Sequence, residues 1–266
     1  MDFKVLGPLE VSHLGCPRTP SPPKTRQLLA LLLLRVNQVV SLDSIITELW
    51  DDRPPRSAVT TAQTYIYQLR KAFAAEVGEE AAGHMISTVL PGYVLRIDER
   101  QLDAPRFDRL VEEARLLTED GEPLRAAGLL ADALAMWRGP ALSNVSCGPV
   151  LASYATHLEE RRISALEARV RTDMELGRHR RLVAELQTLV STYPFNEWFH
   201  TQLILALNRS GRRGDALNAY QRVRRLLGEE LGLDPSAELQ RVHQQVLRVD
   251  GPAVQRMPVG SGARRG

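Results

Sequence analysis

The pattern of the sequence changes about one hundred residues from its start, and this change limits the possible folds more than any other feature. Before it, short segments rich in β-forming residues alternate with amphipathic segments. From Asp103 onward the strand signals vanish, and helical periodicity continues almost to the end of the chain. The sequence therefore predicts a mostly α-helical protein with two domains, residues 1–102 and 103–250. The Gly-, Pro- and Arg-rich tail, 251–266, is expected to be disordered.

The order of elements in the first domain indicates a winged helix-turn-helix with a small β-sheet. An apolar segment broken by Gly7 and Pro8 predicts a strand or hairpin, and Pro91-Gly92 joins two β-rich segments into a second hairpin, the wing. Three helices are expected between them, the second beginning at a serine N-cap. The predicted elements are a strand or hairpin at residues 3–11, helices at 24–35, 42–50 and 56–75, and a hairpin at 85–97.

The second domain contains an internal repeat. The segments ELGRHRRLVAELQTLV and NRSGRRGDALNAYQRV align at an offset of 34 residues, with Gly177 opposite Gly211. Thirty-four residues is the period of tetratricopeptide repeats, in which glycine allows two antiparallel helices to turn sharply. An earlier helical hairpin is expected around Gly121, outside this register. The sequence thus predicts an all-α domain of tetratricopeptide-like helices.

The third predicted helix carries the strongest functional signal. Its apolar residues fall in one sector, which we expect to pack on the core: Val59, Ala62, Ile66, Leu69 and Phe73. The opposite side is polar, and it contains Ser57, Thr60, Thr61, Thr64, Gln68 and Lys71. No Asp or Glu occurs from Arg53 through Ala75, as expected for a helix that lies beside phosphates. Thr and Gln can also hydrogen-bond to base edges in the major groove.

A polar surface helix without a ligand remains the alternative for this segment alone. Its neighbours favour DNA, because Lys24 begins the first helix, where a phosphate is favoured. Arg70 projects near the core sector, which favours a salt-bridging or snorkelling role over a phosphate contact. In the wing, Thr88, Leu90 and Tyr93 would reach the minor groove or the backbone, although a purely structural hairpin fits equally well.

Composition excludes several other classes of protein. The net charge is only +2, so any claim of DNA binding rests on where the charges lie. The six histidines form no metal-ligand pair, Cys16 and Cys147 suggest neither a disulfide nor zinc, and no phosphate-binding or nucleophile motif is present. An enzyme is therefore not expected. A repeat scaffold that binds proteins without DNA would explain the second domain but not the first.

Several longer segments resemble one family of regulators. Three segments resemble an OmpR-type winged helix: KTRQLLALLLLRVNQVVSLDSIITELW, PPRSAVTTAQTYIYQLRKAF and STVLPGYVLRI. Four later segments resemble the bacterial transcriptional activation domain: DAPRFDRLVEEARLL, ALAMWRGPAL, LEERRISALEARV and GLDPSAELQRVHQQVLR. A winged helix followed by this activation domain is the arrangement of the Streptomyces antibiotic regulatory protein family, which the sequence resembles over nearly the whole chain.

The resemblance implies a pathway-specific transcriptional activator of an antibiotic gene cluster, cytoplasmic and associated with the nucleoid, with no membrane contact and no cofactor or metal. Members of this family bind direct repeats in promoter DNA and recruit RNA polymerase with its sigma factor. Direct repeats about one helical turn apart would place two protomers side by side, so a homodimer on DNA is expected.

Carried over residue by residue, the resemblance also implies which side chains bind DNA. Groove contacts are expected from the outer side of the third helix, at Thr60, Thr61, Thr64, Gln68 and Lys71. Contacts with the DNA backbone are expected from Lys24, Arg56 and Tyr93. Tyr67 and Gln68 stand where the family usually has serine and often arginine, so the family's base preference is not carried over.

Overall fold

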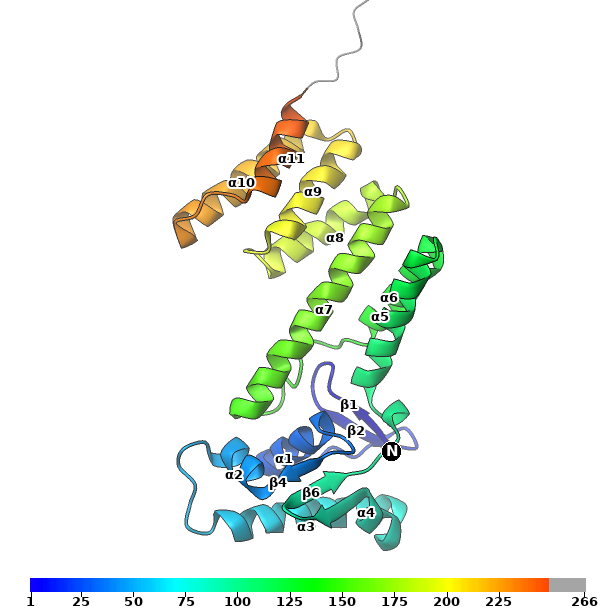
Figure 1. Cartoon of the computed structure of the whole chain (residues 1–266), viewed down its shortest axis with the longest axis vertical. Helices are drawn as coiled ribbons and strands as arrows, with labels where there is room; N and C mark the ends of the chain where they lie inside the picture. Colours follow the sequence, from blue (N-terminus) through cyan, green and yellow to red (C-terminus); the bar gives the residue numbers. More distant parts are fainter. Residues whose placement is uncertain (249–266) are drawn as a thin grey trace, which may run out of the picture. The chain divides into compact units, whose positions relative to one another are not determined.

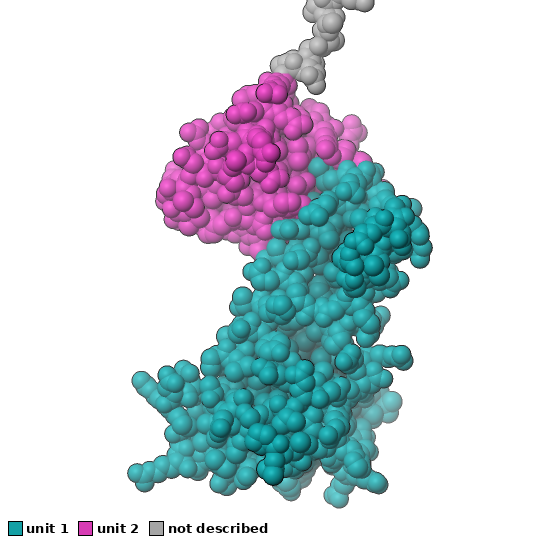
Figure 2. All heavy atoms as spheres, in the orientation of Figure 1, with its two compact units in different colours: residues 1–176 teal, residues 177–266 magenta. Residues whose placement is uncertain are grey.

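The computed structural model describes residues 1–248 and divides into two compact units, Met1–Leu176 and Gly177–Gly266 (Figures 1 and 2). We call them unit 1 and unit 2 and describe each by itself. The expected tail at 251–266 lies outside the described residues. None of the helices within 1–248 combines the length and the apolar composition needed to cross a membrane.

Unit 1 begins with two small antiparallel sheets. The first contains β1 (Asp2–Lys4), β2 (Glu10–His13) and β3 (Cys16–Pro17). In it Phe3 pairs with Val11, which confirms the hairpin expected at the N-terminus. The second has the strand order β4 (Val39–Ser41), β6 (Gly92–Leu95), β5 (Ile86–Val89). Strands β5 and β6 form the predicted wing hairpin.

Three helices pack against these sheets. They are α1 (Pro23–Leu34), α2 (Leu42–Trp50) and α3 (Ala58–Val77). A proline in its first turn starts α1, and all of its leucines except Leu34 are fully buried. The Ser41 side chain caps α2 by accepting a hydrogen bond from Ser44 N at 3.1 Å. These elements form the expected winged helix-turn-helix.

Two details of this region differ from the sequence prediction. Val59 was expected in the core but is 45% exposed, because α3 begins only at Ala58 and its first turn extends past the core. The buried position there is Ala58 instead. A short helix that the sequence did not reveal, α4 (Glu79–Met85), follows α3 and buries only Ala82.

The remaining helices of unit 1 are α5 (Asp103–Glu119), α6 (Pro123–Ala135) and α7 (Pro149–Glu175), after a 3-10 turn, η1 (Glu99–Gln101). Gly121 has φ +77° between α5 and α6, so the expected earlier hairpin is present. Helices α1 and α2 contact both α3 and α7, so α3 lies on the side of the winged helix away from α7 (Figure 1).

Buried carboxylates join the winged helix to these helices. Glu48 of α2 is 1% exposed and accepts hydrogen bonds from Gly148 N (2.6 Å), Val150 N (2.9 Å) and Leu151 N (3.0 Å) at the start of α7. Asp103 accepts from two backbone N–H groups of the segment after β1. Burial raises the pKa of Asp103, although those N–H groups act in the opposite direction. The winged helix and α5–α7 therefore share one compact unit.

The described part of unit 2, residues 177–248, contains four consecutive helices. Its helices are α8 (His179–Thr192), α9 (Glu197–Arg209), α10 (Arg213–Leu231) and α11 (Ala237–Leu247). Gly211 turns the chain between α9 and α10 with φ +80°, and its repeat partner Gly177 has φ +73°. Leu186 and Tyr220, which are 34 residues apart, are both buried. The predicted mostly α architecture with tetratricopeptide-like helices is confirmed.

Candidate nucleic-acid interface

The polar side of α3 is exposed and free of acidic residues, as the sequence predicted. We call its exposed polar side chains the outer face of α3, and they are Thr60, Gln63, Thr64, Tyr67, Gln68 and Lys71. Ala62, Ile66, Leu69 and Phe73 are buried on the opposite side. The first carboxylate along α3 is Glu76, which pairs with Arg18 at 2.5 Å. The outer face therefore offers hydrogen-bonding groups without repelling phosphates.

The threonines of α3 are anchored to the helix itself. Thr64 Oγ1 donates to Thr60 O at 2.9 Å, a bond that holds the side chain in one rotamer. Thr61 is only partly exposed, and its hydroxyl donates to Ser57 Oγ at 3.4 Å. Thr61 therefore lies at the margin of the outer face, whereas Thr60 and Thr64 lie within it.

Gln68 is oriented by a residue of another helix. Thr25 of α1 is 3% exposed, and its hydroxyl donates to Gln68 Oε1 at 2.9 Å. This bond occupies one acceptor site of the amide and leaves both N–H groups of Gln68 Nε2 as donors. Acceptors on purine bases in the major groove are suitable partners for such donors.

Arg70 connects α3 to the wing. Its Nε donates to Ile86 O at 2.8 Å, and its Nη2 donates to Thr88 Oγ1 at 3.0 Å. The guanidinium also lies 5.9 Å from the centre of the Tyr93 ring. The sequence favoured a salt-bridging or snorkelling role for Arg70 over a phosphate contact. In the structure Arg70 bonds within the domain, but its partners are a carbonyl and a hydroxyl and not carboxylates.

The wing itself is held close to β4. A Cβ atom at Gly92 would lie 1.8 Å from Val40 O, so only glycine allows the approach of β6 to β4 at this point. Tyr93 is 9% exposed and packs in the core, which leaves little of it to contact a DNA backbone. At the tip of the wing, Leu90 is 91% exposed.

The two cations expected at the DNA backbone lie in different surroundings. The Lys24 ammonium donates to Leu49 O, at the end of α2, and to Gln27 Oε1 at 3.1 Å. It lines a cavity together with Gly148, near the start of α7. Its ammonium is thus bonded within the protein, and the phosphate contact expected of Lys24 stays a prediction. Arg56, by contrast, is exposed in the loop before α3, and no side chain caps the N-terminus of that helix.

Sequence reasoning missed two residues of the outer face. Gln63 and Tyr67 are both exposed, and Tyr67 is 63% exposed although it is aromatic. At about 100° per residue, Tyr67 lies within about 20° of Thr60 around the helix axis. The spacing that selected the threonines could therefore have selected Tyr67 as well.

Comparisons with known proteins identify both parts of the chain. Residues 18–95 match the family described as transcriptional regulatory protein, C terminal, and residues 102–247 match the bacterial transcriptional activator domain. The chain is 40% identical to the regulatory protein DnrI of Streptomyces peucetius over 96% of this chain and 95% of that protein. It is 38% identical to the transcriptional regulator RedD of Streptomyces coelicolor, over 94% of this chain and 71% of that protein.

A solved structure shows the same fold. The structure of Mycobacterium tuberculosis EmbR in complex with a low affinity phosphopeptide aligns with a TM-score of 0.85 at 33% sequence identity, over 92% of this chain. The present chain spans 64% of that EmbR chain.

Together the exposed α3 helix, the wing and the two matched domains define a DNA-binding transcriptional activator. The chain belongs to the Streptomyces antibiotic regulatory protein family. This family consists of transcriptional regulators of antibiotic biosynthesis and not of enzymes, and an activator of this kind acts on DNA and through RNA polymerase.

Proposed function

We propose that α3 lies in the major groove of promoter DNA and reads bases with its outer face. The acid-free outer face of α3 carries this proposal, because it presents uncharged donors and acceptors where a solvated helix would mix charges of both signs. Residues 1–102 would then be the DNA-binding domain and residues 103–250 the activation domain, even though α5–α7 pack with the former in unit 1.

Within the groove we divide the side chains into two groups. Gln68 and the threonines of α3 would contact base edges, with Gln63 and Tyr67 beside them. Lys71 and Arg56 would contact phosphates at the two ends of the interface, with Arg56 close to the uncapped N-terminus of α3. Lys24 and Tyr93 are left out, because one is bonded to α2 and the other is buried.

The tip of the wing would lie against the neighbouring minor groove. Leu90 is almost fully exposed there, and Arg70 holds the wing at a fixed position relative to α3. Arg70 is thus a positioning residue in this proposal, since two of its N–H groups already bond to the wing.

The wider function follows from the family. We infer that the chain activates one secondary-metabolite gene cluster, that two copies bind side by side on direct repeats about one helical turn apart, and that the activation domain contacts RNA polymerase with its sigma factor. As a regulator of this kind it would act in the cytoplasm, at the nucleoid. The homology to DnrI and RedD over most of their lengths supports these inferences.

Footprinting upstream of the genes adjacent to this one tests the proposal. We expect protection of two half-sites on one side of the duplex, and binding that weakens steeply with salt. Replacing Lys71 with alanine should reduce the slope of log K against log salt by about 1, since one phosphate contact is lost. A matched control is Arg109→Ala, which removes an exposed cation of α5 and should leave the slope unchanged. Binding that shows no salt dependence would contradict the proposal.

A further inference from the structure

Unit 1 contains a second candidate site, away from α3. A cavity of about 440 Å³ lies beside β1, where the chain passes through η1 into α5 and where α6 ends. We call it the joint pocket, because its walls come from both the winged helix and the α5–α6 hairpin. Its volume is within the range of small-molecule sites. Phe3, Leu102 and Met136 supply apolar parts of the lining.

The joint pocket carries more positive than negative side chains. Four cations line it, namely Lys4, Arg100, Arg106 and Arg138, against two carboxylates. One of those carboxylates, Asp103, already accepts hydrogen bonds from Val5 N at 2.8 Å and Leu6 N at 3.1 Å. Lys4 and Arg138 both pair with Glu10, so the positive charge left for an anion comes from Arg100 and Arg106.

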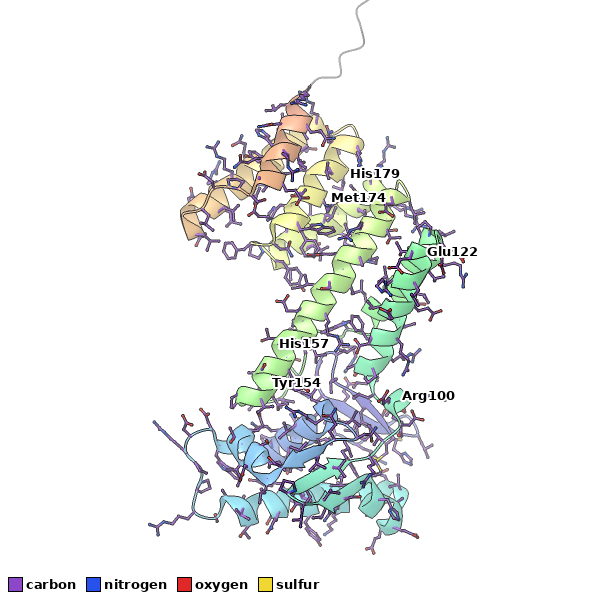
Figure 3. All side chains as sticks on the ribbon, in the orientation of Figure 1. Arg100, Glu122, Tyr154, His157, Met174 and His179 are labelled. Carbon is purple, nitrogen blue, oxygen red and sulfur yellow. The ribbon has the colours of Figure 1, made fainter. Side chains whose placement is uncertain are left out.

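Two of these cations have no acidic partner within residues 1–248. Arg100 and Arg106 are exposed at the rim, and neither forms an ion pair there. Arg100, labelled in Figure 3, projects from η1 at the point where the chain enters α5. Arg106 lies in the first turns of α5, whose N-terminus favours negative charge in the same place.

The guanidinium of Arg138 is incompletely satisfied as well. Its Nη1 lies 2.6 Å from Glu10 Oε1 and its Nη2 lies 3.6 Å from Asp103 Oδ2. Nevertheless its three nitrogens are out of contact with solvent and make no hydrogen bond of acceptable geometry within residues 1–248. Buried donors of this kind favour an additional acceptor.

We propose that the joint pocket binds a small organic anion, a metabolite that carries carboxylate or phosphate groups on an apolar body. Arg100 and Arg106 hold its anionic groups, and Ala135 and Met136 contact the rest. Because the walls belong to both parts of unit 1, such a ligand ties the winged helix to α5 and α6. This site does not depend on the proposed contacts of α3 with DNA.

Isothermal titration calorimetry on the full chain, at constant ionic strength, tests the proposal. The probes are citrate and glucose 6-phosphate, with glucose as the uncharged control. We expect at least one anion to bind and glucose not to bind. Stronger binding of citrate assigns the site to carboxylated metabolites, and stronger binding of glucose 6-phosphate assigns it to phosphorylated ones.

Substitutions locate the binding. Removing both rim cations in Arg100→Ala/Arg106→Ala should raise the Kd at least about tenfold, since hydrogen bonds to charged groups are lost. Arg109→Ala removes an exposed cation three residues further along α5, outside the joint pocket, and should leave the Kd unchanged. No binding of either anion at 10 mM overturns the proposal. An equal loss in both variants also overturns it, because attraction to general surface charge would then explain the binding.

Discussion

Helices α3 and α10 are similar in length but differ in how charge is arranged on them. α10 carries four arginines, at positions 213, 222, 224 and 225, together with Asp215, Glu229 and Glu230. α3 has only Arg70 and Lys71, yet its single carboxylate, Glu76, comes near its end. The helix with more cations is thus the one with an ordinary mixed surface. The absence of carboxylates, and not the number of cations, distinguishes the candidate DNA-binding helix.

Of the changes considered, placing a carboxylate on α3 should reduce promoter affinity the most, because it removes the feature that distinguishes α3 from α10. Thr64→Asp adds a negative charge to the centre of the outer face. Like charges forced together across an interface cost several kcal/mol, so we expect promoter affinity to fall more than about 100-fold. Gel-shift titration measures the change. The matched control is Asn218→Asp on the exposed side of α10, which should bind the promoter like the wild type. Equal losses in both variants would contradict the distinction.

Gln68→Ala tests how the outer face reads sequence, and its expected effect is smaller. We expect about a tenfold loss of preference for one base pair, because one set of donors to a base edge is removed. Selection from a randomised operator measures the preference. Thr25→Val is a companion variant, since Thr25 is buried in α1 and only orients Gln68. It should relax the same base pair to a lesser degree. If Thr25→Val instead weakens the preference at a different base pair of the operator, Thr25 does not orient Gln68 as proposed.

The sequence was sufficient for most of this fold because its signals are local. The 34-residue offset correctly paired Gly177 with Gly211, and the core positions of α3 from Ala62 to Phe73 follow directly from helical spacing. Val59 was misplaced because the first turn of a helix extends beyond the core that the later turns define. The short α4 was missed because it buries only Ala82.

The candidate interface was predicted less completely, because single side chains depend on distant partners. The first turn of α1 indicated that Lys24 could bind phosphate, but its ammonium reaches the carbonyl of Leu49 at the end of another helix. Nothing near Glu48 in the sequence indicates that its carboxylate holds the start of α7, a hundred residues away. Helical periodicity shows which side of a helix is buried, but it does not show which distant residue a side chain bonds to.

Acidification should lower the folding stability of the helices around α10 without changing DNA binding by α3. Burial lowers the pKa of His200, and Arg222 acts in the same direction, whereas the hydrogen bond with Pro194 O at 2.9 Å and the charge of Glu197 oppose them. Burial also lowers the pKa of His243, which stacks on Tyr220 of α10 at 3.7 Å and is near Arg224. Both therefore bind protons more readily in the unfolded chain, so their contribution to stability is lost as pH falls through about 6.5, the unfolded value.

The measurement is urea unfolding followed by tryptophan fluorescence at pH 7.5 and 5.5. We expect the midpoint of wild-type unfolding to fall more between these pH values than that of a His200→Gln/His243→Gln variant. No histidine lies in α3, so the affinity for promoter DNA should not follow the same titration. An equal change of midpoint in both proteins would show that groups other than His200 and His243 produce the pH dependence.

The arginines of α10 provide the prediction with the smallest expected effect. Replacing Arg222, Arg224 and Arg225 with alanine removes three positive charges, more than α3 itself carries. If cation number determined which helix meets DNA, this variant would lose affinity and its salt slope would fall by about 3. Because α10 mixes charges of both signs, we expect both quantities to match those of the wild type in gel-shift titrations over a range of salt. A reduced slope would mean that unit 2 contacts phosphates as well, and that the absence of carboxylates on α3 is not what selects the DNA-binding surface.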